Sequence, residues 1–146
     1  MSAASPKTVV IVDDEKSYVD LMSLLLGDNL GCPVVTFTRP LAALKALPGL
    51  DVGVIVTDYY MPELNGLEFI ALAREIVPEV PFILITGHSI GMDDNELAHV
   101  TGLRKVLHKP LGWRRLADEI VRHWPAGTPP PRYHPATPAP DPATLI

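Results

Sequence analysis

The sequence predicts an α/β fold in which a parallel sheet lies between two layers of helices. Five apolar runs, bounded by Gly, Pro, Asp or Lys, predict strands at 8–12, 34–37, 52–57, 81–86 and 105–108. Segments with a helical spacing of apolar residues lie between these runs. A strand that alternates with a helix five times implies parallel strands joined by right-handed crossovers, and hence a three-layer sandwich.

The strands and helices differ in how their apolar residues are spaced. The first strand, 8–12, is continuously apolar, which is typical of a strand buried on both faces. The helices are marked by apolar residues three and four positions apart, which place each set on one face, expected to be the inner one. These residues are Tyr18, Leu21, Met22 and Leu25; Leu41, Leu44 and Leu47; Leu67, Ile70 and Val77; and Trp113, Leu116, Ala117, Ile120 and Trp124. On the last helix we expect Arg114, Arg115, Asp118, Glu119 and Arg122 to face solvent, and we expect one more helix within 95–101.

A chain of 146 residues, 47% of them hydrophobic, has room for one domain with one core. We expect an N-terminal extension at 1–7, the folded domain at 8–124 and a tail at 125–146. The tail carries eight of the sixteen prolines and almost no apolar periodicity. This composition favours extended conformations and buries too little surface to offset the entropy of ordering, so we expect disorder rather than a docking segment.

Composition also limits the partners and the compartment. The net charge is −5 and the twelve basic residues are thinly spread, which argues against direct nucleic-acid binding and favours a protein partner. The single cysteine, Cys32, has no second cysteine for a disulfide or a zinc site, which indicates a reducing compartment. The apolar run at 9–12 is too short for a signal segment or a membrane span. We therefore expect a cytoplasmic protein without membrane insertion.

Polar residues follow four of the predicted strands at their carboxyl ends. Asp13 and Asp14 follow the first strand, Asp58 the third, Thr86 ends the fourth and Lys109 follows the fifth. In a flavodoxin-like strand order, 2-1-3-4-5, the first and third strands are neighbours at the point where ligands bind. The three carboxylates would then share one pocket, and their repulsion would require a cation. Oxygen ligands of this kind suit Mg²⁺.

This constellation is suited to phosphoryl chemistry. A carboxylate beside a metal can attack phosphorus in line, while the Thr86 hydroxyl and the Lys109 ammonium bind the phosphoryl oxygens. Each residue has a simpler explanation alone, as a helix cap, a turn residue or a solvated strand end. Those explanations do not account for all of them lying at carboxyl ends of apolar strands.

Four sequence segments resemble the receiver domains of two-component response regulators in order and spacing. They are Val10-Ile11-Val12-Asp13-Asp14-Glu15, Thr57-Asp58-Tyr59-Tyr60-Met61-Pro62, Ile85-Thr86-Gly87-His88 and Lys109-Pro110. The resemblance extends over about 8–124, and Leu64-Asn65-Gly66-Leu67-Glu68 is similar to the family's start of the third helix. The absence of an output module after 124 resembles the single-domain regulators.

By this resemblance, Asp58 accepts the phosphoryl group from a histidine kinase or phosphotransfer protein. It also implies that Asp14 ligates Mg²⁺ directly, that Asp13 does so through water and that the Tyr60 carbonyl completes the site. Thr86 and Lys109 are assigned to the phosphoryl oxygens, and the Lys109-Pro110 peptide is expected to be cis. The implied activity is self-catalysed phosphotransfer with slow autodephosphorylation, in a signalling domain rather than an enzyme.

The resemblance also indicates how the signal is read. In the family, Thr86 moves toward the phosphoryl group and an aromatic residue on the fifth strand turns inward, but here that position is Val106. Valine has no ring and is stiff at χ1, so we hypothesise a weakened or rerouted switch. Tyr60 and His88 occupy positions that tune dephosphorylation in the family. A downstream protein target is expected to bind the face that carries Lys105, Val106, Trp113 and Arg114.

Three other interpretations compete with a phosphorylated receiver. A pseudo-receiver that binds proteins without being phosphorylated has Val106 and the Pro-rich tail in its favour. A phosphatase of the haloacid dehalogenase type needs a second Asp two positions after the first, where this chain has Tyr60. A nucleotide-binding domain needs a Gly-rich turn after the first strand, where Asp13-Asp14-Glu15 would repel phosphates.

Overall fold

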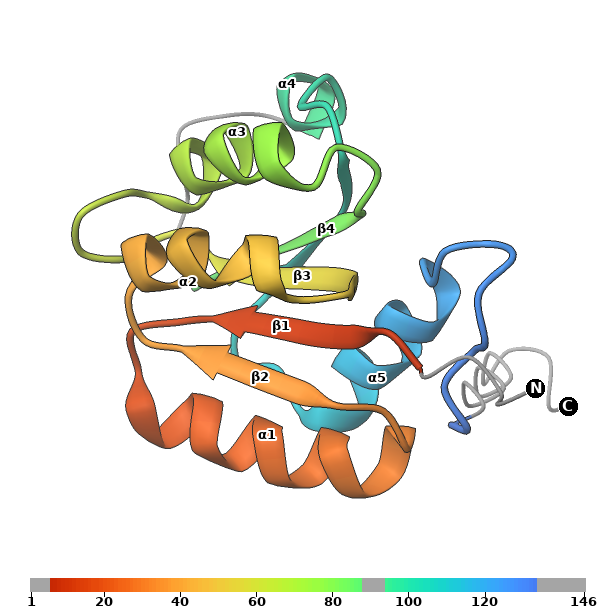
Figure 1. Ribbon diagram of the computed structural model, residues 1–146. Coiled ribbons are helices and arrows are strands. Elements are labelled where there is room, and N and C mark those ends of the chain that lie inside the picture. Colours follow the sequence, from red (N-terminus) through yellow and green to blue (C-terminus); the bar gives the residue numbers. More distant parts are fainter. Residues whose placement is uncertain (1–5, 88–93, 134–146) are drawn as a thin grey trace, which may run out of the picture.

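The computed structural model describes residues 6–87 and 94–133 of the chain, and Figure 1 shows its strands and helices. In chain order these are β1 (Thr8–Val12), α1 (Lys16–Leu30), β2 (Val34–Phe37), α2 (Pro40–Ala46), a 3₁₀ turn (Leu47–Gly49), β3 (Val52–Asp58), α3 (Gly66–Ile76), β4 (Phe82–Thr86), α4 (Asp94–Ala98), β5 (Leu103–His108) and α5 (Trp113–Arg122). The five predicted strands are confirmed, and the largest difference is that β5 begins two residues earlier, at Leu103.

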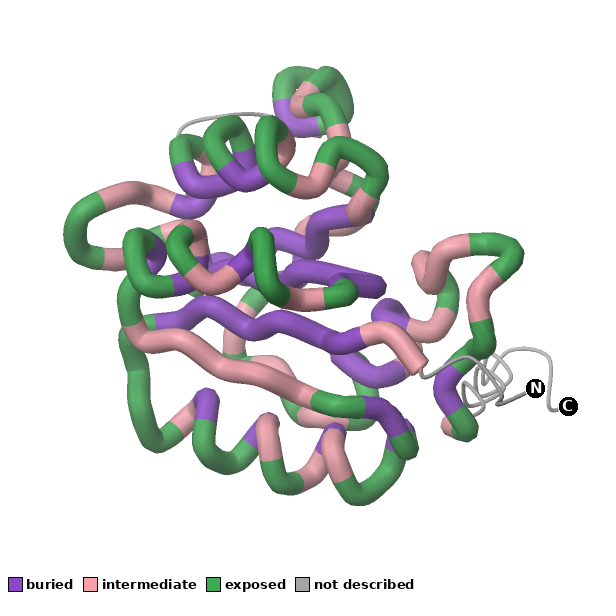
Figure 2. The backbone as a smooth tube through the Cα atoms, in the orientation of Figure 1, coloured by how far each residue is buried: buried purple, intermediate pink, exposed green. Residues whose placement is uncertain are grey.

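The sheet is parallel throughout, with strand order β2-β1-β3-β4-β5, so the predicted flavodoxin-like topology is confirmed. Figure 1 shows α1 and α5 on one face of the sheet and α2 and α3 on the other. Figure 2 shows that β1, β3 and β4 are buried along their length, whereas β2 at one edge is half-buried. Burial on both faces explains why the central strands are continuously apolar.

Two apolar clusters, one on each face of the sheet, form the core. One joins Ile11 and Val54 to residues of α1 and α5, such as Leu26 and Ile120. The other joins residues such as Val10 and Ile55 to α2 and α3. Neighbouring positions of one strand therefore enter opposite clusters, as the two-residue period of a strand requires. The clusters fix the sheet between two helical layers and leave its carboxyl edge for polar residues.

Local sequence sets where the helices begin and end. Pro40 opens α2, and Gly31 ends α1 with a left-handed backbone at φ +69°. Asn65 and Glu68 form a reciprocal capping box at the start of α3. Within the described residues, none of the helices combines the length and apolar character that a membrane crossing requires.

Two expected helix faces were partly wrong. Leu21 and Leu41 are 51% and 48% exposed, while Val19 and Ala43 are buried in their place. Apolar residues occur around most of α1, so spacing alone did not identify its inner face. Glu119 of α5 was expected to face solvent, and it is buried.

Three basic side chains of the same helix region accompany the buried Glu119 carboxylate. Arg115 and Arg122 donate to Oε1 at 2.9 and 2.8 Å, and His123 Nε2 lies 3.4 Å from Oε2. These pairs offset the cost of burying a carboxylate. The acidic residue therefore lies inward because its basic neighbours cover it.

The first part of the expected tail contacts the folded domain. Arg132 N donates to the carbonyl of Leu30 at 2.8 Å, and the Tyr133 hydroxyl donates to Asp118 at 2.8 Å. Pro131 is buried, and the Trp124 indole donates to the carbonyl of Pro129 at 2.9 Å. Residues 125–133, the first part of the tail for which disorder was expected, therefore contact α1 and α5 through aromatic and backbone groups. The remainder, 134–146, lies outside the described residues.

Candidate functional site

Three carboxylates meet at the carboxyl edge of the sheet. Asp13 directly follows β1 and Asp58 ends β3, and the register pairs Val12 with Thr57 on these neighbouring strands. Carboxylate oxygens of Asp13, Asp14 and Asp58 all lie within 4.8 Å of one another. Asp13 and Asp58 are buried, whereas Asp14 is exposed. The predicted convergence of these residues is therefore present.

Lys109, which follows the edge strand β5, also reaches the carboxylates. Its Nζ donates to Asp13 Oδ2 at 2.9 Å, to Glu15 Oε1 at 3.3 Å and to Asp58 Oδ2 at 3.5 Å. Its backbone N donates to the carbonyl of Thr86 at 2.9 Å, which ties the chain after β5 to the end of β4. The Lys109–Pro110 peptide is cis, as expected.

Backbone amides orient both buried carboxylates. Glu15 N donates to Asp13 Oδ1 at 2.9 Å, and Tyr59 N donates to Asp58 Oδ1 at 2.9 Å. In each carboxylate one oxygen is therefore held by the backbone, and the other lies toward the ammonium of Lys109. This arrangement fixes the direction in which Oδ2 of Asp58 points.

The start of α3 is pressed against the end of β3. Gly66 N donates to the carbonyl of Tyr59 at 2.7 Å. A Cβ at Gly66 would lie 2.5 Å from the backbone oxygen of Asp58 and 2.7 Å from a methyl carbon of Leu84. Only glycine fits this contact, which holds the loop after Asp58 in place.

Among the residues that the structure describes, the negative charges of the site outnumber the positive ones. Burial, followed by the nearby charge of Asp13, raises the pKa of Asp58 to about 6. Burial also raises the pKa of Asp13, despite the attraction of Lys109. Burial lowers the pKa of Lys109, but the hydrogen bond and charge of Asp13 and the charge of Asp58 outweigh it and hold that pKa above its usual value. One ammonium thus contacts three carboxylates, and the carboxylate of Asp14 lies beside two of them.

The donor set fits a divalent cation with a preference for oxygen. Asp14, Asp58, Lys109 and Tyr60 line a pocket of about 220 Å³ that opens to solvent, with Glu15 and Gly87 beside them. Carboxylate oxygens and an open face that admits water are what Mg²⁺ prefers. The Tyr60 carbonyl stays a predicted ligand, and Tyr60 does line the pocket.

The remaining predicted residues have different surroundings. Thr86 is buried at the end of β4, one residue beyond Ile85, the register partner of Asp58. The Tyr60 side chain is 47% exposed and lies edge-on to Tyr59, with ring centroids 4.7 Å apart. His88 lies outside the described residues. The roles of Thr86, Tyr60 and His88 therefore stay predictions.

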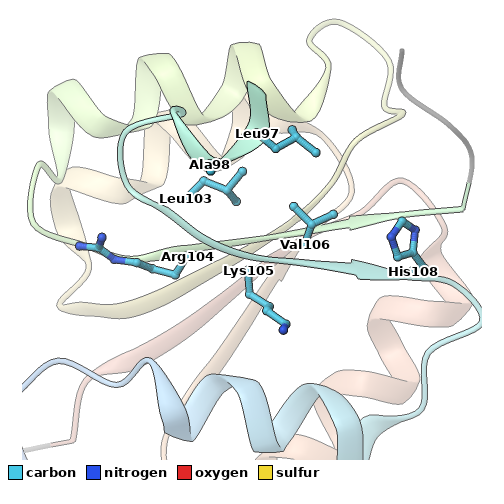
Figure 3. Close-up of a pocket in the computed structure, with 7 residues that line it drawn as sticks. All are labelled: Leu97, Ala98, Leu103, Arg104, Lys105, Val106 and His108. Carbon is cyan, nitrogen blue, oxygen red and sulfur yellow. The ribbon is translucent and has the colours of Figure 1, made fainter. Parts of the chain in front are cut away.

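Val106 lines a separate hollow between α4 and β5. Figure 3 shows Val106 and Leu103 pointing toward Leu97 of α4, while Lys105 points the other way. The hollow measures about 330 Å³, and Arg104, Lys105 and His108 contribute to its walls. Val106 is half-buried there, so the position expected to hold a switching ring carries a short side chain beside open space.

Two residues of the site had no predicted role in it. Glu15 belongs to a recognised motif without a predicted role of its own, yet its carboxylate lies 3.3 Å from the Lys109 ammonium. Tyr18 was expected only on the inner face of α1, yet the Lys109 ammonium lies 4.9 Å from its ring centroid. A helix that starts directly after Glu15 points the side chains of its first turn back toward the end of the strand. The closeness of Glu15 and Tyr18 to Asp13 in sequence was therefore a usable signal that they lie near the site.

Comparison with known proteins gives matches to one family model and to several regulatory proteins. Residues 9–121 match the family model described as the response regulator receiver domain. The protein PilG of Pseudomonas aeruginosa is 28% identical over 123 residues, which cover 83% of this chain and 90% of PilG. The transcriptional regulatory protein FixJ of Bradyrhizobium diazoefficiens is 35% identical over 80 residues, or 55% of this chain.

Solved structures of other proteins have a similar fold. The chemotaxis protein CheY4 of Vibrio cholerae superimposes with a TM-score of 0.72 at 26% identity, covering 82% of this chain and 99% of CheY4. A receiver domain protein of Clostridium thermocellum gives a TM-score of 0.71 at 26% identity, covering 80% and 93%. The chain spans 38% of FixJ and 28% of the Escherichia coli regulator GlrR. With a family match over most of its length and the fold and acidic cluster described above, the chain belongs to the response regulator receiver domain family.

Proposed function

We propose that this chain is a receiver that accepts a phosphoryl group on Asp58 with the help of Mg²⁺ and thereby changes its protein contacts. The observation that carries the proposal is the orientation of Asp58. Its Oδ1 accepts a hydrogen bond from Tyr59 N, and its Oδ2 faces Lys109 beside two further carboxylates. A buried carboxylate fixed in this way is prepared to act as a nucleophile.

The proposed chemistry is a single displacement at phosphorus. Asp58 Oδ2 forms a bond to phosphorus as the bond from phosphorus to the donor breaks, and the electron pair of that bond leaves with the donor. Lys109 contacts Asp58 at 3.5 Å. As negative charge moves to the phosphoryl oxygens, its ammonium donates hydrogen bonds to them, and the Thr86 hydroxyl is a second donor. Asp13, Asp14, Asp58 and the Tyr60 carbonyl would hold Mg²⁺, which offsets their charge and binds a phosphoryl oxygen.

The partners and setting are part of the same proposal. The donor is a histidine kinase or a phosphotransfer protein, and the receiver of the signal is a downstream protein rather than nucleic acid. The net charge of −5 supports a protein partner. A cytoplasmic location is also proposed, supported by the single cysteine. Phosphotransfer to Asp58 and slow autodephosphorylation are the reactions that complete the proposal.

One specific observation favours a second candidate, a pseudo-receiver that binds proteins without phosphorylation. Val106 leaves open space beside β5 where an aromatic switch residue is expected. The two candidates differ in whether Asp58 reacts.

Tyr60 offers a further test within the first candidate, because its half-exposed ring lies beside the pocket where water would attack. Tyr60→Gly is expected to shorten the lifetime of the phosphoryl group, and an unchanged decay rate contradicts that role.

The experiment is intact-mass measurement after incubation with a small phosphodonor and Mg²⁺. The native protein, Asp58→Ala and a metal-free sample are compared. A single phosphoryl adduct that needs both Asp58 and the metal supports the receiver. No adduct, even with a phosphohistidine protein as donor, supports the pseudo-receiver instead.

A further inference from the structure

Beneath the Lys109 ammonium lies the ring of Tyr18. Nζ is 4.9 Å from the ring centroid, within the distance at which a cation is attracted to an aromatic face. Tyr18 comes from the first turn of α1 and packs against the core cluster on that side of the sheet. The ammonium is thus bounded by three carboxylates and by one aromatic face.

The ring, rather than the hydroxyl, makes this contact. The Tyr18 hydroxyl is buried and has no hydrogen-bond partner among the described residues. Burial, followed by the charge of Asp13, raises the pKa of Tyr18 to about 12, so the phenol stays neutral near neutral pH. The hydroxyl therefore neither anchors Lys109 nor competes for it, and the interaction depends on the π face alone.

The ring also covers a side of Lys109 that would otherwise be open. Glu15, Tyr18, Lys109, Pro110 and Leu111 line a hollow of about 510 Å³ next to the acidic pocket, together with Gly87. Of the three carboxylates around the ammonium, that of Glu15 is 61% exposed, whereas those of Asp13 and Asp58 are 2% and 8% exposed. Without the ring, the ammonium has room to move outward toward Glu15 and away from Asp58.

We propose that Tyr18 is a positioning residue for phosphoryl transfer, whose ring face holds the Lys109 ammonium against Asp13 and Asp58. The inference rests on the proposed function, since it assigns a role in that reaction. A ring face suits this role because it attracts the ammonium without taking one of its three N–H donors. Lys109 keeps its donors for the carboxylates and for the arriving phosphoryl oxygens.

The test uses two variants of the full chain that differ in the ring. Tyr18→Phe keeps the aromatic face and removes the unpartnered hydroxyl, while Tyr18→Leu keeps an apolar side chain and removes the face. Tyr133→Leu serves as a control, because Tyr133 packs on Trp113 and Asp118 instead. The first readout is the rate of adduct formation with acetyl phosphate and Mg²⁺. We expect Tyr18→Phe and the control to react at the native rate, and Tyr18→Leu to react about 3- to 10-fold more slowly.

The second readout reports the contact itself. In protein labelled with ¹³C-lysine, the ε-methylene protons of one of the five lysines are expected to be shifted upfield by the ring, and Lys109→Arg identifies the signal. The shift should persist in Tyr18→Phe and disappear in Tyr18→Leu. Thermal unfolding of the variants is measured alongside. It distinguishes the loss of this contact from a general loss of folding.

Each outcome bears on a separate statement. If the native protein is phosphorylated and Tyr18→Leu reacts at the native rate, the role of Tyr18 is overturned while the proposed function stands. If Tyr18→Phe is as slow as Tyr18→Leu, the hydroxyl and not the ring matters, and the inference is wrong. If the native protein forms no adduct, the proposed function fails and the kinetic role falls with it, whereas the lysine shift still decides the contact.

Discussion

Lys109 and Asp13 are 96 residues apart in sequence, and their side chains lie 2.9 Å apart, Nζ to Oδ2. The pair connects the residue after β5 to the residue after β1, across the two intervening strands of the sheet. Both side chains are largely buried, so solvent screens their attraction little. The geometry of the candidate site therefore depends on the whole sheet being assembled.

Removing the charge of Asp58 is expected to stabilise the metal-free protein. Burial and the charge of Asp13 disfavour the ionised carboxylate, so Asp58→Asn should raise the free energy of unfolding by about 1–3 kcal/mol at neutral pH. Urea denaturation with a chelator measures this. Asp51→Asn, at an exposed carboxylate paired with Lys7, is the control and should change the value by at most about 0.5 kcal/mol. A less stable Asp58→Asn protein would contradict the unbalanced charge described above.

A side chain at Gly66 is expected to disrupt the loop that holds Asp58. Gly66→Ala places a Cβ 2.5 Å from the backbone oxygen of Asp58, and we expect a loss of about 2 kcal/mol or more in stability. The matched control is Gly27→Ala in α1, where the added carbon has no neighbour within 4 Å apart from adjacent residues and the backbone of its own helix. That change should raise stability by roughly 0.5–1 kcal/mol, as alanine favours a helix over glycine. Equal effects of the two substitutions in thermal unfolding would argue against the close contact.

Cys32 is expected to react slowly with thiol reagents while the protein is folded. Burial raises its pKa to about 11 from an ordinary 9.0, so near pH 8 the reactive thiolate is roughly a hundred-fold scarcer than in an exposed cysteine. Because the shift is upward, reactivity should climb with pH up to about 11. Alkylation followed by mass spectrometry, with a guanidinium-unfolded sample for comparison, gives the rates. Equal rates in the two samples would show that the thiol is accessible.

The segment 125–133 is expected to stabilise the domain. A chain ending at Trp124 loses the hydrogen bonds from Arg132 to Leu30 and from Tyr133 to Asp118. We expect its free energy of unfolding to fall by about 1–3 kcal/mol. A chain ending at Tyr133 keeps these contacts and is the comparison. If both chains unfold at the same denaturant concentration, the segment adds nothing to stability.

The strands and the acidic cluster were predictable because each rests on a local signal. Buried parallel strands are continuously apolar, as at Val52–Asp58, and a polar residue that ends such a run must lie at the sheet edge. The strand order was predicted as flavodoxin-like, because that order makes the first and third strands neighbours at the point where ligands bind. Asp13, Asp58 and Lys109 meet as expected because parallel strands align their carboxyl ends.

The errors lie where the tertiary environment decides. Leu21 and Val19 are both apolar, and only packing against the sheet shows that Val19 is the buried one. Glu119 is a different case, because Arg115, Arg122 and His123, which cover its carboxylate, are only three or four positions away along the chain. That spacing was a local signal, and the expected solvent face did not take it into account. The contact of Tyr18 with Lys109 joins residues far apart in sequence, so only the closeness of Tyr18 to Asp13 along the chain indicated that it lies near the site.

The most direct test of the central claim locates the phosphoryl group on the chain. Protein treated with a phosphodonor and Mg²⁺ is reduced with borohydride, which converts an aspartyl phosphate to homoserine, and the peptides are sequenced by mass spectrometry. We predict homoserine at position 58 alone, and none without Mg²⁺ or donor. Homoserine at Asp13 or Asp14 instead, or unmodified Asp58 in protein that carries the adduct, would contradict the assignment of Asp58 as the acceptor.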